Sequence, residues 1–118
     1  MVYLKRDDIL NFDDIKTVEV DVPEWNGAVI VKMMTGQERD SFEASCIGAK
    51  DGTFKMDNIR AKLVAKTVID PETKEPMFTV ADIEALGKKS AAALDRIFTA
   101  SQKLSKISEK DVEDLAKN

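Results

Sequence analysis

The sequence predicts an α+β fold, in which an N-terminal β-hairpin packs on a mainly helical domain of four to five short helices. Two alternating apolar runs flank Asn26–Gly27, and this dipeptide between such runs is the strongest short-range signal of a hairpin. Several later segments space their apolar residues for one face of a helix. The 118 residues suit a single domain spanning 1–118, because domains commonly hold about 100–200 residues.

The hairpin is expected to join strands at about 17–22 and 28–34, after one or two helical turns within 6–12. A two-residue turn at Asn26–Gly27 would pair Val22 with Val31, and would place a charge pair of Asp21 and Lys32 on the other face. The valines of both strands then share one face, because side chains alternate along a strand. We therefore expect this valine face to pack on the helices.

A capping box, in which Thr35 is followed three residues later by Glu38, predicts a helix over about 36–46. Gly48 and the polar run 50–53 are expected to end it. Apolar residues at helical spacing predict the next helix over about 57–67, with Asp57 near its start.

A surface turn is expected at Pro71 and Pro76, because proline breaks a helix. Ile69 and the pair 77–78 can form a short second hairpin around this turn.

Two more capping boxes predict helix starts, at Thr79 with Asp82 and at Ser108 with Asp111. The first begins a helix over 80–86, which Gly87 is expected to close as the residue after the helix. The rest of the chain is predicted to form a helix over about 88–104 and, after a break near 108, a short final helix over 109–116.

The composition argues against an enzyme and against nucleic-acid binding. Lys and Arg number 18 against 22 Asp and Glu, so the net charge is −4 and no basic stripe exists to neutralise phosphates. Histidine is absent, which excludes Ser-His and Cys-His nucleophiles and histidine-bound zinc. Cys46 is expected to be a small buried apolar residue. No phosphate loop or calcium loop appears, so we expect no cofactor and no metal.

No apolar run approaches the roughly 18 residues of a membrane span, and no secretory leader is apparent. We expect a protein of a reducing cytoplasm that does not contact the membrane. By elimination, the residues favour a module that binds other proteins.

Four apolar residues are the candidates for binding a partner: Trp25, Ile30, Met34 and Met77. Trp25, Ile30 and Met34 are expected on the more polar face of the hairpin, and tryptophan is enriched among the residues that dominate binding energy. Methionine side chains adapt to varied partners. For Trp25 a second interpretation stays open, in which it lies over its own hairpin or under a helix.

The order of motifs resembles the tail assembly chaperones of long-tailed bacteriophages and prophages. The hairpin VEVDVPEWNG at 18–27 is similar to that family's VEVPEWGG. The helix start TGQERDSFE at 35–43 matches its pattern [ST]GxERDxFE. The segment at 68–98 resembles DxxGxPLFTxxDxxxLxxKSxxALxxI, except that Pro71 and Pro76 replace the usual Asp-Gly turn. The resemblance spans roughly residues 14–104.

The resemblance implies a non-enzymatic chaperone, which binds the tape measure protein and recruits the tail tube protein in the cytoplasm of the bacterial host. It also implies self-association as a homo-oligomer, absence from the mature virion, and a longer form of the chain made by ribosomal frameshifting. The final residues 116–118 are compatible with a slippery codon sequence, which the gene itself would test. The alternative function is a small structural tail component, such as a tube, terminator or connector subunit.

Overall fold

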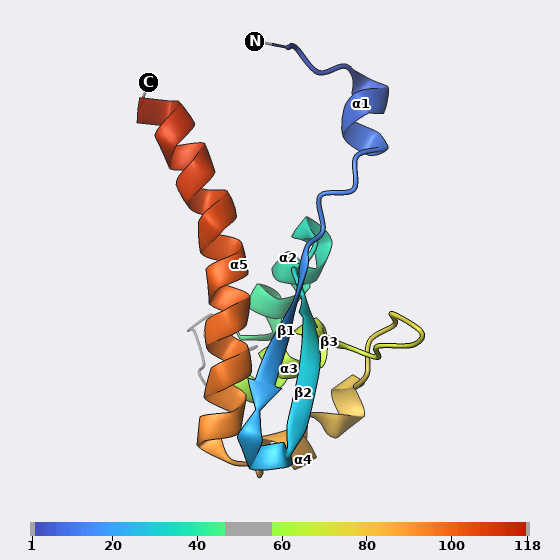
Figure 1. The fold of residues 1–118 in the computed structure, drawn as a ribbon, viewed down its shortest axis with the longest axis vertical. Helices are drawn as coiled ribbons and strands as arrows, with labels where there is room; N and C mark the ends of the chain where they lie inside the picture. Colours follow the sequence, from blue (N-terminus) through green and yellow to red (C-terminus); the bar gives the residue numbers. More distant parts are fainter. Residues whose placement is uncertain (1, 47–57, 118) are drawn as a thin grey trace.

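The computed structural model describes residues 2–46 and 58–117, with side chains described as far as residue 104. It has the predicted α+β architecture, a three-stranded antiparallel sheet in the order β1-β2-β3 with helices packed on it. In Figure 1, α5 runs alongside the hairpin, and the arm that carries α1 extends away from the sheet. The elements in chain order are α1 (Arg6–Leu10), β1 (Thr17–Val22), the 3-10 turn η1 (Pro23–Trp25), β2 (Gly27–Lys32), α2 (Gly36–Ser45), α3 (Ile59–Thr67), β3 (Val68–Ile69), the 3-10 turn η2 (Val80–Asp82), α4 (Ile83–Gly87) and α5 (Ala91–Lys117).

The register of the β1–β2 hairpin differs from the predicted one. Val22 pairs with Gly27 instead of Val31, a shift of four residues, so Asp21 and Lys32 do not lie opposite each other. Because four is an even number, the side chains within the two strands keep their predicted faces. Val22 and Val31 are accordingly both fully buried in the core.

The shift arises in the turn, which is longer than two residues. Pro23 has no N–H to donate to a sheet, so β1 ends before it and η1 follows. Asn26 then adopts the left-handed conformation, with φ of 57°, and donates its N–H to the Pro23 carbonyl at 3.1 Å. The prediction of a turn at the Asn-Gly pair is therefore confirmed, but its predicted length of two residues is wrong.

The second hairpin forms around the proline-containing turn as predicted. Ile69 of β3 bridges to Pro76, and the Met77 N–H donates to the Val68 carbonyl at 3.1 Å. β3 also pairs with β2, which adds the third strand to the sheet. The helix before it, α3, begins at Ile59; the predicted start at Asp57 and the predicted helix stop at Gly48 and 50–53 lie outside the described residues.

Gly87 does not play the predicted role of a left-handed residue after the helix. It is the last residue of α4, and Lys88 caps the helix in a right-handed conformation. A Cβ at position 87 would lie 2.5 Å from Oδ1 of Asn58, at the start of α3. The glycine therefore permits a close approach of two helices.

The predicted helices over 88–104 and 109–116 are one continuous helix, α5, of 27 residues. It begins after Ser90, whose Oγ accepts from the Ala93 N–H at 3.3 Å. The predicted start at Ser108 is wrong, because residues 88–118 contain no glycine or proline to interrupt the helix. Capping residues favour a helix start, but they do not end a helix already formed.

The core lies between the valine face of the hairpin, α3, α4 and the inner stripe of α5. Its fully buried residues include Val64, Val68 and Ile97. Cys46 is also fully buried, as predicted. The only buried polar side chains among the described residues are Thr67 and Ser101, and Thr67 Oγ1 donates to the Leu63 carbonyl at 2.8 Å.

Candidate interaction surface

An apolar groove of about 560 Å³ opens between α2, α3 and the segment 76–83. Three parts of the chain that are distant in sequence form it, so it exists only in the folded protein. Its apolar lining consists of Phe42, Ala65, Pro76, Phe78, Val80 and Ile83.

The cap of η2 positions Val80, an exposed apolar residue of the groove. The Thr79 N–H donates to Oδ2 of Asp82 at 2.9 Å, which turns the chain into η2 immediately before Val80. Val80 is 81% exposed, whereas Phe78 and Ile83 pack against the core as a hydrophobic staple around the cap. Phe78 and Ile83 are thus held against the core, whereas the Val80 side chain remains open in the groove.

Two lysines from α3 line the groove beside α2. Lys62 Nζ donates to the Ser45 carbonyl at 2.9 Å, and Lys66 Nζ donates to Oγ of Ser41 at 3.2 Å. Both acceptors are neutral, and within the described part of the chain neither lysine forms an ion pair with a carboxylate. Glu38 also lines the groove but is paired with Lys32, so the two α3 amines leave positive charge there for an acidic partner.

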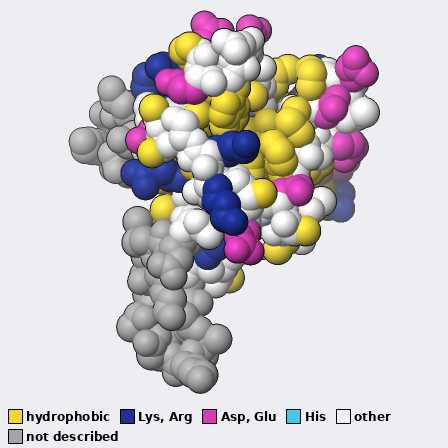
Figure 2. Space-filling view, turned by 90° about the horizontal axis from the view of Figure 1, so that it is seen from below, with side chains coloured by type: hydrophobic (Ala, Val, Ile, Leu, Met, Phe, Trp, Pro, Cys, Tyr) yellow, Lys and Arg dark blue, Asp and Glu magenta, His cyan; other side chains and the backbone are white. Residues whose placement is uncertain are grey.

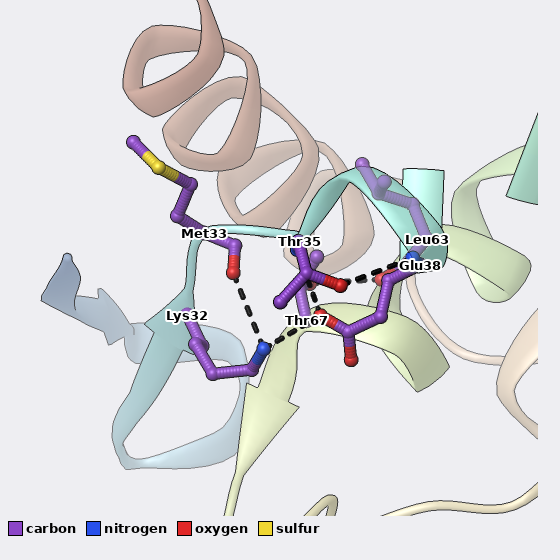
Figure 3. A network of polar contacts seen from close by, with 6 residues as sticks. All are labelled: Lys32, Met33, Thr35, Glu38, Leu63 and Thr67. Carbon is purple, nitrogen blue, oxygen red and sulfur yellow. Dashed lines mark hydrogen bonds and ion pairs between the residues drawn. The ribbon is translucent and has the colours of Figure 1, made fainter. Parts of the chain in front are cut away.

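A polar network joins the end of β2 to the first turn of α2, one wall of the groove (Figure 3). Lys32 Nζ lies 2.7 Å from Oε1 of Glu38 and 3.3 Å from the Met33 carbonyl oxygen. The predicted capping box is present: Oε1 of Glu38 accepts from the Thr35 N–H at 2.9 Å, and Thr35 Oγ1 accepts from the Glu38 N–H at 3.1 Å.

The environment of Glu38 favours its charged form. Partial burial raises the pKa of this carboxyl, but hydrogen bonds from Lys32 and Thr35 outweigh burial and hold the pKa below its usual value of 4.5. The side chains of Lys32 and Glu38 are only 19% and 29% exposed, so water screens their attraction less than on an open surface. The network therefore fixes the orientation of α2.

A second ion pair holds the hairpin turn against α5. Arg96 forms a forked contact with Glu24, at 2.8 Å from Nε to Oε1 and 3.1 Å from Nη2 to Oε2. This contact lowers the pKa of Glu24 and raises that of Arg96. Trp25, the next residue, is half-buried and packs against the core.

The four residues predicted to bind a partner do not form one patch. Of the two interpretations open for Trp25, the structure supports the second, in which it packs against the protein's own core. Ile30 is half-buried and pairs with Ile69 of β3. Met34 is half-buried and follows the C-terminal end of β2, whereas Trp25 precedes the N-terminal end of that strand. Met77 is 40% exposed. Their role in partner binding stays a prediction.

Sequence reasoning missed the most exposed apolar side chains of the described chain, which lie at Val80 and in the N-terminal arm, residues 2–16. Val80 follows a helix cap, a position where an acidic residue is favoured, so a valine there was a detectable signal. Figure 2 looks at the end of the molecule that carries α4 and the hairpin turn, and shows hydrophobic side chains gathered in this face with charged ones around them. The open apolar surface is therefore not limited to isolated residues.

No cluster of three or more His, Cys, Asp or Glu side chains able to hold a metal occurs in residues 2–46 and 58–104. Among the described residues no helix combines the length and the apolar composition that crossing a membrane requires.

The fold is similar to that of a solved phage protein. The structure of the bacteriophage HK97 tail assembly chaperone matches with a TM-score of 0.58 at 18% sequence identity, over 80% of this chain and 85% of that chain. No protein-family model and no curated protein matches the sequence. The chain thus has the fold of a tail assembly chaperone, the fold expected from the order of its motifs.

Proposed function

We propose that this chain is a non-enzymatic tail assembly chaperone, which binds the tape measure protein and recruits tail tube protein to it. The observation that carries the proposal is the fold shared with the HK97 tail assembly chaperone over 80% of the chain. The motifs at 18–27, 35–43 and 68–98 point to the same family from the sequence alone. The protein would act in the cytoplasm of the bacterial host.

The open apolar surface supports a holding function. A long helical partner exposes apolar faces before it is assembled, and a protein with open apolar side chains can cover them. Binding of this kind stabilises the soluble partner by mass action and needs no chemical step. Val80 and Met77, at 81% and 40% exposure, provide apolar surface on the body of the protein.

Co-expression with the tape measure protein encoded beside this chain tests the proposal. We expect the soluble fraction of the tape measure protein to rise and the two proteins to purify together. Expression of this chain with an unrelated aggregation-prone helical protein is the control, and its solubility should not change. An unchanged soluble fraction of the tape measure protein, with no complex recovered, would refute the proposal.

Analysis of purified virions separates this function from that of a structural tail component. A chaperone leaves when assembly ends, so peptides of this chain should be absent from the virion by mass spectrometry. A tube, terminator or connector subunit would be present in a fixed number of copies per particle.

A further inference from the structure

The N-terminal arm carries apolar surface that its own chain leaves uncovered. No residue of α1 is buried. Six large apolar side chains of the arm are 58% to 85% exposed: Val2, Tyr3, Leu4, Ile9, Leu10 and Phe12. Apolar side chains that cluster on a surface, rather than occurring singly, mark interaction sites.

The apolar groove between α2, α3 and 76–83 has the complementary character. Its volume of about 560 Å³ lies within the range of sites that enclose a ligand of several side chains. Its lining includes the exposed apolar residue Val80 and, beside α2, the amines of Lys62 and Lys66.

The arm is acidic around its apolar segment, although Arg6 pairs with Asp7 at the start of that segment. Asp7 and Asp8 precede Ile9 and Leu10, and Asp13 and Asp14 follow Phe12, so carboxylates flank the apolar segment on both sides. The groove lining carries the amines of Lys62 and Lys66, and its acidic residue, Glu38, is paired with Lys32. Matching of an acidic segment to these amines favours a specific orientation of docking.

We propose that the arm of one copy docks in the groove of a second copy of this chain. Ile9, Leu10 and Phe12 would enter the apolar lining, and the flanking carboxylates would meet Lys62 and Lys66. The arm extends away from the body of its own chain, and no arm residue lines its own groove (Figure 1). Such a contact joins two different surfaces, so it builds a ring, a reciprocal dimer or an open chain of copies.

Two pairs of neighbouring substitutions test the arm and the groove in the full chain. Phe12→Asp places a charge on the docking segment, and Asn11→Asp adds the same charge beside it without removing apolar surface. Val80→Asp places a charge in the groove, and Ala81→Asp adds it at an exposed position outside the groove. All four positions are exposed, so circular dichroism should show four folded variants.

Sedimentation velocity over a range of concentrations measures the self-association of each variant. We expect the unmodified chain to self-associate, and Phe12→Asp and Val80→Asp each to raise the dissociation constant at least about tenfold, as loss of a central apolar contact does. Asn11→Asp removes no apolar atom and adds to the carboxylates of the segment, and Ala81→Asp lies outside the groove, so each should leave the dissociation constant within about twofold. A chain that is monomeric at every concentration would overturn the proposal. This outcome covers docking of the arm in the groove of its own chain, because such a chain is also monomeric. Equal effects of test and control variants would overturn it as well.

Mixing the Phe12→Asp variant with the Val80→Asp variant gives the decisive test. The Phe12→Asp copy retains an intact groove and the Val80→Asp copy retains an intact arm, so one contact can form between them. The mixture should give a one-to-one complex and nothing larger. A mixture that stays monomeric overturns the proposal. None of these results depends on the tape measure protein, so they stand apart from the test of the proposed function.

Discussion

A double-mutant cycle on Lys32 and Glu38 measures how strongly the polar network fixes α2 to the sheet. Lys32→Met retains the apolar stem of the lysine and removes its charge. Glu38→Gln removes the carboxylate charge but keeps an oxygen that can accept from the Thr35 N–H, as glutamine does in capping boxes. The cycle therefore isolates the contact of 2.7 Å between the ammonium and the carboxylate.

The expected coupling free energy is about 1–2 kcal/mol. Fully exposed ion pairs contribute about 0.2–1 kcal/mol, because water and salt screen them. Hydrogen bonds to charged groups contribute about 1.5–3 kcal/mol. The Lys32–Glu38 pair, at 19% and 29% exposure, lies between these cases. The exposed pair of Arg39 and Glu43, at 3.3 Å on one face of α2, serves as the control and should couple by about 0.3–0.5 kcal/mol.

Urea unfolding followed by circular dichroism at pH 7 gives the free energy of unfolding for each member of the cycle. One kcal/mol shifts the urea midpoint by about 0.3–1 M for a domain of this size, which is readily measured. A coupling between Lys32 and Glu38 no larger than that of the control pair would refute the view that the network holds α2 in place.

The remaining predictions concern pH, the hairpin turn and the exposed surface. The free energy of unfolding should fall as the pH drops below about 4.5, because Glu24 and Glu38 have lowered pKa values in the folded protein and the unfolded chain then binds more protons; unfolding titrations between pH 7 and 3 measure this. Trp25→Ala should lower the free energy of unfolding by about 2–3 kcal/mol, below the cost for a fully buried aromatic residue, because Trp25 is half-buried against the core; a loss under about 0.5 kcal/mol, within the range of ordinary surface substitutions, would contradict this packing. Met77→Asp should reduce the soluble yield of co-expressed tape measure protein without changing the melting temperature, whereas Thr99→Asp, at an exposed position on α5, should change neither.

The faces of the hairpin were predictable from the sequence, but its register was not. Alternation of valines depends only on the period of a strand, so Val22 and Val31 were correctly placed in the core. The pairing of Val22 with Gly27 depends instead on the conformation of Pro23 to Asn26, and the Asn-Gly signal alone favoured a tighter turn. Local signals therefore located the turn without fixing its length.

The interaction surface was harder to predict than the fold. The groove joins Phe42, Lys66 and Val80 from three separate segments, and no short pattern reports their proximity. The sequence left Trp25 open between an interface and the core, and the turn carries it onto the core, where Arg96 holds the neighbouring Glu24. Sequence spacing alone does not predict the position of a side chain that is set by long-range packing.

Native mass spectrometry of this chain mixed with the tape measure protein proposed as its partner tests the proposed function most directly. A chaperone that coats a long helical partner should give one complex that contains several copies of this chain for each copy of the tape measure protein. Recovery of the two proteins only as separate species, under conditions where both are folded and soluble, would contradict it.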